Sequence, residues 1–254
     1  MKNILSIENL TVSVGAKALV DRVSFDVPQG KIVAIAGGSG SGKTTIGLSV
    51  LRLLPAALSV RGGSIVFEGR DLLGLSTEEM RQLRGSRIGM VFQEPLSAFD
   101  PLFTIGAQLD EVLVAHTKLS KQERYKKVLE TLSEVELPDP KRAYESFPHQ
   151  LSGGMRQRAM VAQAIVGDPS LIIADEPTSS LDVTLQAKIM ELFGRLKKKN
   201  ISIVLIAHDL GMIARLADEV IILRQGVLVE KGLVGKVCGQ PQHEYTKQLV
   251  GAFQ

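Results

Sequence analysis

The chain has 254 residues, of which 44% are hydrophobic and 22% are charged, and its formal net charge is +3. These values are typical of a globular protein with one large domain or two smaller ones. The mean hydropathy is slightly positive at +0.14, but no apolar run approaches the roughly 18 residues that a membrane span requires. Glu8 stands where a signal peptide would keep its apolar core. We therefore expect a cytoplasmic protein that acts on a membrane only through partners.

The cysteine and lysine residues indicate which metal, disulfide and nucleic-acid sites the chain can form. The single cysteine, Cys238, excludes an internal disulfide and a metal cluster held by cysteines alone. Three lysines at 197–199 could contact nucleic acid, but such a run before Asn200 is more typical of a solvated helix end. No nucleic-acid partner is expected.

The chain begins with segments of strand character. Residues 4–14 and 23–27 alternate apolar and polar side chains, as half-buried strands do. A turn at 28–30 precedes the short apolar run 31–36, which is suited to a buried strand. The following segment 44–54 is predicted to be a helix.

Between this strand and this helix, residues 37–45 read G-G-S-G-S-G-K-T-T and fit the phosphate-binding pattern G-x-x-x-x-G-K-[ST]. Glycines let the backbone curl so that several N–H groups point at a polyphosphate at the helix N-terminus. Lys43 would neutralise the β- and γ-phosphates, and the Thr44 hydroxyl would bind Mg²⁺. A flexible Gly/Ser turn is the structural alternative, which the strand and helix on either side disfavour. The predicted nucleotide-binding residues are Gly37, Gly38, Ser39, Gly40, Ser41, Gly42, Lys43, Thr44 and Thr45.

The next region changes from mixed to helical character. Strands are predicted at 64–68 and 87–92, with a capping box at 76–79 that opens a short helix between them. Further along, 105–115 has apolar residues at helical spacing, and a second capping box at 120–123 opens another helix.

The domain organisation follows from this change. We expect a helical subdomain over 94–158, inserted into an α/β core formed by 1–93 and 159–235, with a short C-terminal tail over 236–254. No element is predicted within the tail.

The last third alternates strands and helices again. Strand patterns occur at 170–174 and 201–207, and a helix is predicted over 183–198 between them. This order indicates parallel β/α units in an open sheet. Segments 220–223 and 227–230 resemble a closing hairpin.

Two acids follow the strand at 171–174. In a protein with a phosphate-binding loop, a carboxylate at such a strand end holds the Mg²⁺ shell, and we assign this role to Asp175. Glu176 could orient a water and remove its proton for attack on the γ-phosphate. Capping of the next helix is the structural alternative for the pair.

Three further sites are candidates for chemistry. Ser152, Gly153 and Gly154 open an amphipathic helix, where an N-cap and exposed N–H groups form a second anion site or a plain helix cap. Gln93 follows a predicted strand, and its amide oxygen could reach Mg²⁺ or the attacking water. His208 follows the strand 201–207 directly, at the carboxyl end where parallel sheets bind ligands, and it could donate to the γ-phosphate.

Taken together, these motifs resemble those of the ATP-binding subunit of ABC transporters over about residues 4–246. They stand in the family order: Walker A (37–44), the Q-loop Gln93, the signature Leu151, Ser152, Gly153, Gly154 and Met155, Walker B (171–175) with Glu176, the D-loop Ser180, Leu181 and Asp182, and the switch His208.

The resemblance implies a fold, a reaction and cofactors. The fold is α/β: a P-loop NTPase core of the RecA type, with an N-terminal antiparallel β subdomain and an inserted α-helical subdomain. The cofactors are ATP and Mg²⁺, with catalytic roles for Glu176, His208 and Gln93, and Mg²⁺ held by Thr44, Gln93 and Asp175.

The resemblance also implies partners. Two ATPase subunits dimerise head to tail, so that each ATP lies between one Walker A loop and the signature of the other subunit. The second subunit is commonly a paralogue in this subfamily, although a second copy of the chain stays open. Two transmembrane permeases, and indirectly an extracytoplasmic substrate-binding protein, complete the assembly. The chain would lie at the cytoplasmic face of the inner membrane as a peripheral subunit.

Shorter segments are similar to the dipeptide, oligopeptide and nickel importers. These segments are Q-E-P-L-S-A-F-D-P at 93–101, P-H-Q at 148–150 and P-x-H-x-Y-T at 241–246. The loop sequence G-G-S-G-S-G-K and L-L-P-A at 53–56 look most like the nickel-importer ATPase. The sequence therefore favours import of nickel or another chelated divalent metal, with import of dipeptides or oligopeptides as the alternative.

One departure from the family concerns the base. An aromatic side chain near the end of the first strand stacks on adenine in the family, and Val14 occupies that place here. Because valine has no π face, we expect an apolar contact and weak discrimination between bases.

Other ABC classes fit less well. A DNA-repair type would carry a long coiled coil between Lys43 and Ser152, and no sustained heptads occur there. A translation-factor type would need two cassettes, and an exporter half would normally carry fused membrane helices. A non-transport ABC ATPase stays a remote alternative, and a catalytically dead module is disfavoured because every catalytic motif is complete.

Overall fold

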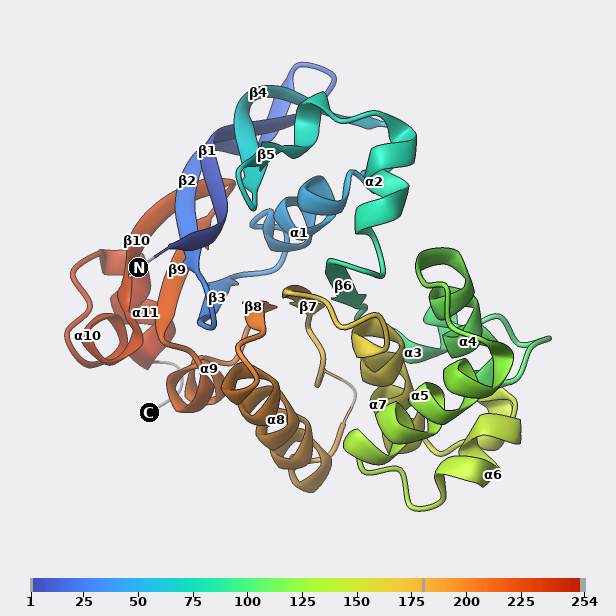
Figure 1. Cartoon of the computed structure of the whole chain (residues 1–254). Coiled ribbons are helices and arrows are strands. Elements are labelled where there is room, and N and C mark those ends of the chain that lie inside the picture. The colour runs from blue at the N-terminus through green and yellow to red at the C-terminus, as the bar shows by residue number, and fades with distance from the viewer. Residues whose placement is uncertain (1, 180, 252–254) are drawn as a thin grey trace. The chain divides into compact units, whose positions relative to one another are not determined.

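A computed structural model describes residues 2–179 and 181–251 of the chain (Figure 1). Its contacts divide the chain into two compact units. The first unit comprises Met1–Met80 and Leu196–Gln254, and the second comprises Arg81–Arg195. The subdomain limits at 94 and 158 inferred from the sequence stay a prediction.

The N-terminal part of the first unit is an antiparallel sheet with the strand order β2-β1-β4-β5. The strands are β1 (Asn3–Val14), β2 (Lys17–Pro28), β4 (Leu58–Phe67) and β5 (Arg70–Asp71). Alternating burial along β1 and β2 confirms the predicted half-buried strands.

Strands β2 and β4 are longer than the sequence pattern indicated. The sequence pattern predicted a strand only over 64–68, whereas β4 begins at Leu58 and continues through the glycines at 62–63. Gly63 has φ +90°, and a Cβ atom there would lie 2.4 Å from the carbonyl oxygen of Glu8. The register between β1 and β4 shifts at this point, as expected at a bulge. The glycines therefore mark an irregular step within one strand and not its beginning.

The remaining strands of the first unit lie in the order β10-β9-β3-β8. They are β3 (Ile32–Gly37), β8 (Ser202–Ile206), β9 (Glu219–Arg224) and β10 (Val227–Leu233). Strand β3 pairs in parallel with β8 and β9, and β10 closes the edge as the predicted antiparallel hairpin. Every residue of β3 and β8 is buried, which explains their continuous apolar runs.

Helices and one ion-pair network complete the first unit. The helices are α1 (Lys43–Leu51), η1 (Leu72–Gly74), α9 (Leu210–Leu216), α10 (Val234–Gly239) and α11 (Glu244–Gly251), and α2 (Thr77–Leu83) crosses into the second unit. The capping box at 76–79 is confirmed, since the Glu79 carboxylate accepts from the Ser76 N–H and the Ser76 hydroxyl accepts from the Glu79 N–H. The tail, for which no element was predicted, forms α10 and α11.

The Asp218 carboxylate fixes the start of the central strand β3. It accepts hydrogen bonds from Lys197 Nζ at 2.8 Å, the Ile32 N–H at 2.9 Å and Lys31 Nζ at 3.2 Å. Burial by itself raises the pKa of this carboxyl, but these hydrogen bonds outweigh it and hold the pKa below its ordinary value. The run 197–199 thus contributes a structural ion pair at a helix end.

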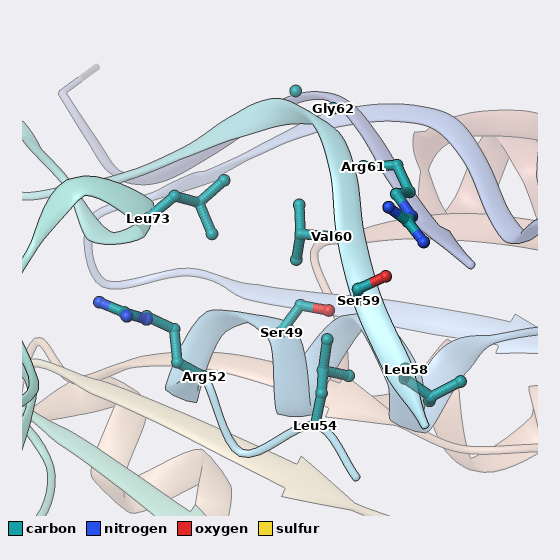
Figure 2. A pocket seen from close by; sticks show the side chains of 10 residues that line it. Ser49, Arg52, Leu54, Leu58, Ser59, Val60, Arg61, Gly62 and Leu73 are labelled. Carbon is teal, nitrogen blue, oxygen red and sulfur yellow. The ribbon is translucent and has the colours of Figure 1, made fainter. Parts of the chain in front are cut away.

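A hollow of about 480 Å³ lies in the first unit between the C-terminal end of α1 and β4 (Figure 2). Arg52 follows α1 directly, and its guanidinium donates to the carbonyl oxygens of Leu72 and Leu75. Because α1 begins at Lys43, this hollow lies at the opposite end of the helix from the phosphate-binding sequence. It is therefore a separate feature from the predicted nucleotide site.

The second unit combines a parallel strand pair with a helical region. Strands β6 (Ile88–Val91) and β7 (Leu171–Asp175) pair in parallel. The helices are α3 (Pro95–Ala98), α4 (Ile105–His116), α5 (Lys121–Glu134), α6 (Pro140–Glu145), η2 (Pro148–Gln150), α7 (Gly153–Ile165) and α8 (Val183–Lys198), the last of which ends in the first unit. No helix within 2–179 or 181–251 is both long and apolar enough to cross a bilayer.

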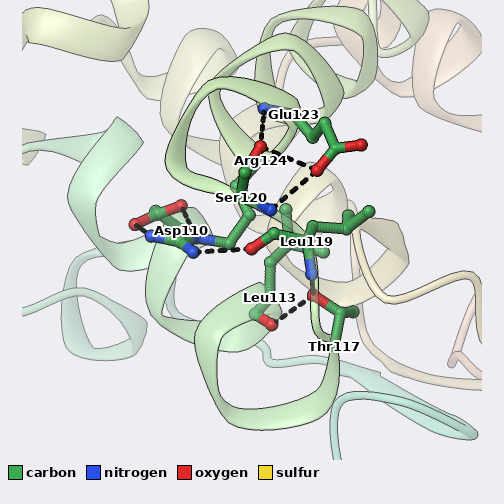
Figure 3. Close-up of polar contacts among 7 residues, drawn as sticks. All are labelled: Asp110, Leu113, Thr117, Leu119, Ser120, Glu123 and Arg124. Carbon is green, nitrogen blue, oxygen red and sulfur yellow. Dashed lines mark hydrogen bonds and ion pairs between the residues drawn. The ribbon is translucent and has the colours of Figure 1, made fainter.

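The junction between α4 and α5 shows why this helical region keeps its geometry (Figure 3). The second predicted capping box is confirmed, since Ser120 and Glu123 cap each other's backbone N–H groups. The Arg124 guanidinium donates to both carboxylate oxygens of Asp110 on α4, at 2.7 and 3.3 Å, and to the carbonyl oxygen of Leu119 at 2.9 Å. A bidentate, charge-assisted pair therefore links α4 to the first turn of α5.

Candidate functional site

The phosphate-binding sequence forms the turn between β3 and α1 in the first unit. Gly42 is the N-cap of α1 and has φ +98°. Lys43 is only 7% exposed, and its Nζ donates to the carbonyl oxygens of Gly37 and Gly38, both at 2.9 Å. The loop therefore curls around its own lysine, at a helix N-terminus where N–H groups attract anions.

The loop is also fixed from outside by the β9–β10 hairpin. Gly37 has φ +154°, and a Cβ atom there would lie 2.2 Å from the carbonyl oxygen of Leu223 at the end of β9. The Ser41 carbonyl accepts from the Gly226 N–H at 3.1 Å. The Ser41 hydroxyl is buried without a hydrogen-bond partner within the described part of the chain. Such an unpaired group in a glycine-rich anion site fits a polyphosphate, whose oxygens accept hydrogen bonds.

Two other predicted residues lie in the first unit. Ile35 of β3 pairs with Ile206 of β8, and the Ala207 N–H donates to the Ile35 carbonyl at 3.2 Å. His208 therefore follows β8 at the same sheet edge where Gly37 ends β3, and its side chain is exposed. Val14 is the last residue of β1, is 38% exposed and can offer only an apolar contact to a base.

The predicted acids and Gln93 lie in the second unit. Asp175 ends β7 and is 4% exposed. Glu176 follows with φ +43°, a left-handed conformation that is uncommon for a residue with a side chain and is found at functional turns. Gln93 Nε2 donates to Glu176 Oε2 at 3.2 Å. The structure thus brings together Gln93 and Glu176, which are 83 positions apart in the sequence.

The signature segment begins helix α7, also in the second unit. The Ser152 side chain caps the helix by accepting from the Met155 N–H at 3.3 Å. Ser152 and Gly153 are exposed, whereas Leu151 and Gly154 are buried. The helix N-terminus therefore presents a serine and a glycine to the surroundings, which suits recognition of an anion from outside the unit.

Two glutamines that the sequence analysis did not identify hold this region together. Gln157 on α7 is 1% exposed, and its Nε2 donates to the Pro177 carbonyl at 2.6 Å. Gln186 on α8 donates to the carbonyls of Thr178 and Leu181, both at 3.2 Å. The signature helix and the segment after Glu176 therefore share one hydrogen-bonded frame. Single glutamines within amphipathic helices carry no sequence signal for such contacts.

The predicted D-loop lies within this frame. Asp182 accepts from the Leu185 N–H at 2.9 Å in the first turn of α8. Leu181 bonds through its N–H to the Thr178 carbonyl at 3.2 Å. The third member, Ser180, lies outside the described residues.

The predicted Mg²⁺ ligands, one in the first unit and two in the second, carry oxygen atoms of the types that this ion prefers. Thr44, in the first turn of α1, offers a hydroxyl, Asp175 a carboxylate and Gln93 an amide oxygen. Oxygen ligands of these types suit Mg²⁺, which proteins commonly hold through one or two carboxylates together with phosphate oxygens and water.

Comparison with protein families and curated proteins gives the class of protein that the sequence motifs indicated. The family described as "ABC transporter" matches residues 20–179. The dipeptide transport ATP-binding protein DppD of Bacillus subtilis is 45% identical, over 99% of this chain and 77% of the relative. The oligopeptide transport ATP-binding protein OppD of the same organism is 41% identical, over 98% of this chain and 72% of the relative.

Solved structures show the same fold. A dimeric ATP-binding cassette in a post-hydrolysis state with ADP and Pi superposes with a TM-score of 0.80 at 29% identity, over 91% of this chain and 98% of that one. The protein cbiO1 from Clostridium perfringens, part of the ABC transporter complex cbiONQ, gives a TM-score of 0.82 at 25% identity, over 94% and 92%. The predicted fold class is confirmed.

Proposed function

The chain belongs to the ABC transporter family of ATP-binding proteins, and on this premise we propose that it is the ATPase subunit of an importer of short peptides. The observation that carries the proposal is the similarity to a dipeptide transport ATP-binding protein, which extends over 99% of this chain and 77% of the relative. The segments at 93–101 and 241–246 support the same subfamily. The nickel preference drawn from the loop sequence and from 53–56 finds no support in these relatives, so the peptide alternative takes its place.

We assign the following parts of ATP hydrolysis to individual residues. The N–H groups of 37–45 and the Lys43 ammonium hold the β- and γ-phosphates. Thr44, Asp175 and Gln93 hold Mg²⁺, which when bound neutralises phosphate charge. Glu176 accepts the proton of the attacking water, and the Gln93 amide keeps its carboxylate in place. His208 donates a hydrogen bond to the γ-phosphate.

A second ATPase subunit completes each site in this proposal. The exposed N-terminus of α7 at Ser152 and Gly153 would meet the γ-phosphate held by the other subunit. Leu181 and Asp182 of the D-loop would lie at the dimer contact. A paralogue is the partner we favour, because the subfamily commonly pairs two different ATPases, and a second copy is the alternative. The assembly would be peripheral, at the cytoplasmic face of the membrane.

An exposed apolar segment in the second unit is the surface that we assign to a permease partner. Leu96, Leu102 and Phe103 are 55%, 79% and 56% exposed, which is unusual for large apolar side chains so close together in sequence. The segment is nevertheless well held. The amide oxygen of the buried Gln108 accepts from the Asp100 N–H at 2.9 Å, and its Nε2 donates to the carbonyl oxygens of Asp100 and Phe103, both at 3.0 Å. A fixed apolar surface favours docking of a partner, here the cytoplasmic segment of a transmembrane subunit.

Replacing Leu102 by Asp should therefore uncouple the ATPase from transport. We expect peptide uptake in cells to fall about tenfold or more, because a charge replaces an exposed apolar anchor. ATP binding by the purified chain should stay unchanged, since the nucleotide residues are untouched. Leu119→Asp, at another exposed leucine of the same unit, is the matched control and should leave uptake intact. Wild-type uptake by the Leu102 variant would contradict the docking assignment.

The choice of cargo can be tested by uptake of a labelled dipeptide and of labelled nickel in cells with and without this chain. We expect loss of dipeptide uptake, restored by the wild-type chain but not by Lys43→Ala, with nickel uptake unaffected. The ATPase does not touch the cargo, so only transport reports on it. Loss of nickel uptake alone would show that the metal preference was right.

A further inference from the structure

A tyrosine from the C-terminal helix contacts the phosphate-binding loop. The Gly38 N–H donates to Tyr245 Oη at 2.8 Å, and the two residues are 207 positions apart in the sequence. Gly38 belongs to the loop 37–45, whereas Tyr245 lies in the first turn of α11. Figure 1 labels this C-terminal helix. A tyrosine hydroxyl thus occupies one of the backbone N–H groups of the predicted anion site.

Tyr245 is held in place by the β9–β10 hairpin. The Glu230 carboxylate of β10 accepts from the Gln242 and His243 N–H groups, at 2.9 and 3.0 Å, at the entry to α11. The Tyr245 N–H then donates to His243 Nδ1 at 3.1 Å. The guanidinium of Arg224, at the end of β9, lies 5.1 Å from the centre of the tyrosine ring. These contacts fix the direction of the hydroxyl.

The hydroxyl acts on the same peptide group as the loop lysine. The Gly38 N–H and the Gly37 carbonyl belong to one peptide plane, since they share one C–N bond. Tyr245 Oη accepts from the N–H at one end of this plane, and Lys43 Nζ donates to the carbonyl at the other end. Glycine on both sides leaves the plane easy to rotate, and Gly37 already has φ +154°. Tyr245 therefore restrains a soft point of the loop.

We propose that Tyr245 is a positioning residue for nucleotide binding, because it fixes the Gly37–Gly38 peptide plane and so the resting place of the Lys43 ammonium. The inference rests on the proposed site at 37–45. Without the Tyr245 hydroxyl the peptide plane can rotate, and the loop must then be ordered at the moment when the polyphosphate binds. The loss should appear in affinity for ATP more than in turnover.

The test is Tyr245→Phe, which removes the hydroxyl and keeps the ring on Arg224. We expect the Kd for ATP of the purified full-length chain, measured by displacement of a fluorescent ATP analogue, to rise about 3- to 10-fold. In the transporter assembled with its partners, KM for ATP should rise by a similar factor while kcat stays within about twofold. The Tm without nucleotide should change by less than about 2 °C, because packing is preserved.

Two controls keep the result interpretable. Tyr125→Phe removes the hydroxyl of a 38% exposed tyrosine in the second unit and should change none of these values. If Tyr245→Phe binds ATP like the wild type, or loses affinity only in proportion to a fall in Tm, the positioning role is overturned. Lys43→Ala measured alongside separates the two claims. Unchanged ATP binding by the Lys43→Ala variant would overturn the proposed site. If Lys43→Ala loses ATP binding while Tyr245→Phe binds ATP like the wild type, only the role of Tyr245 is overturned.

Discussion

Glu176→Gln is expected to lower ATP hydrolysis by about 10²- to 10⁴-fold, the contribution of a general base, while ATP binding stays within about twofold of wild type. The amide has nearly the shape of the carboxylate, so it can keep the backbone at φ +43°. It also retains an oxygen that can accept the hydrogen bond from Gln93 Nε2. What the variant loses is the ability to take a proton from water. The defect should therefore lie in the chemical step alone.

The measurement is ATP turnover by the assembled transporter, with ATP binding followed separately on the purified chain. Because hydrolysis would no longer release the nucleotide, we also expect Glu176→Gln to accumulate as a dimer with ATP on a sizing column. Glu191→Gln, an exposed glutamate of α8, is the matched control and should hydrolyse ATP normally. Turnover within about tenfold of wild type would exclude Glu176 as the base.

The sequence predicted best what is encoded locally. The hydrophobic period placed β1, β3, β7 and α8 within a few residues, because each has a clear pattern bounded by turn or capping residues. The motifs also supplied the candidate site residues, since each predicted phosphate or metal contact depends on a short run of residues, and these assignments stay predictions. The alternation of strands and helices in the last third indicated the open parallel sheet, and the resemblance of the motifs to ABC ATPases supplied the fold class.

The remaining features depend on contacts between distant residues, which no local pattern records. The short helices α3, α6 and α9 are stabilised by tertiary packing and capping more than by their own propensity, because so few turns cannot form a stable helix alone. The contacts of Gln157 with Pro177, and of Tyr245 with Gly38, join segments 20 and 207 positions apart. The transported substrate could not be predicted from local patterns either, because the ATPase subunit of a transporter does not bind that substrate.

Lys43→Ala is expected to have the second large effect: a loss of ATP affinity of about 100-fold or more, and no measurable peptide uptake. Lys43 Nζ lies at 2.9 Å from two loop carbonyls, buried at the start of α1, so its charge is held next to the place predicted for the β- and γ-phosphates. Charge is worth more in such a site than in water. The alanine variant removes it without adding bulk.

Two comparison variants show whether the loss of ATP binding comes from the missing charge, from the shape of the side chain or from a less stable first unit. Lys43→Arg keeps the charge but replaces a compact ammonium by a broad planar group at a buried position, so ATP binding should stay strongly impaired. Lys31→Ala removes a different lysine of the same unit, which donates to Asp218 at 3.2 Å. It should lower the thermal stability slightly and leave ATP affinity intact. If Lys31→Ala lost ATP binding as severely as Lys43→Ala, the effect would reflect general instability of the first unit, and the specific role of Lys43 would be rejected.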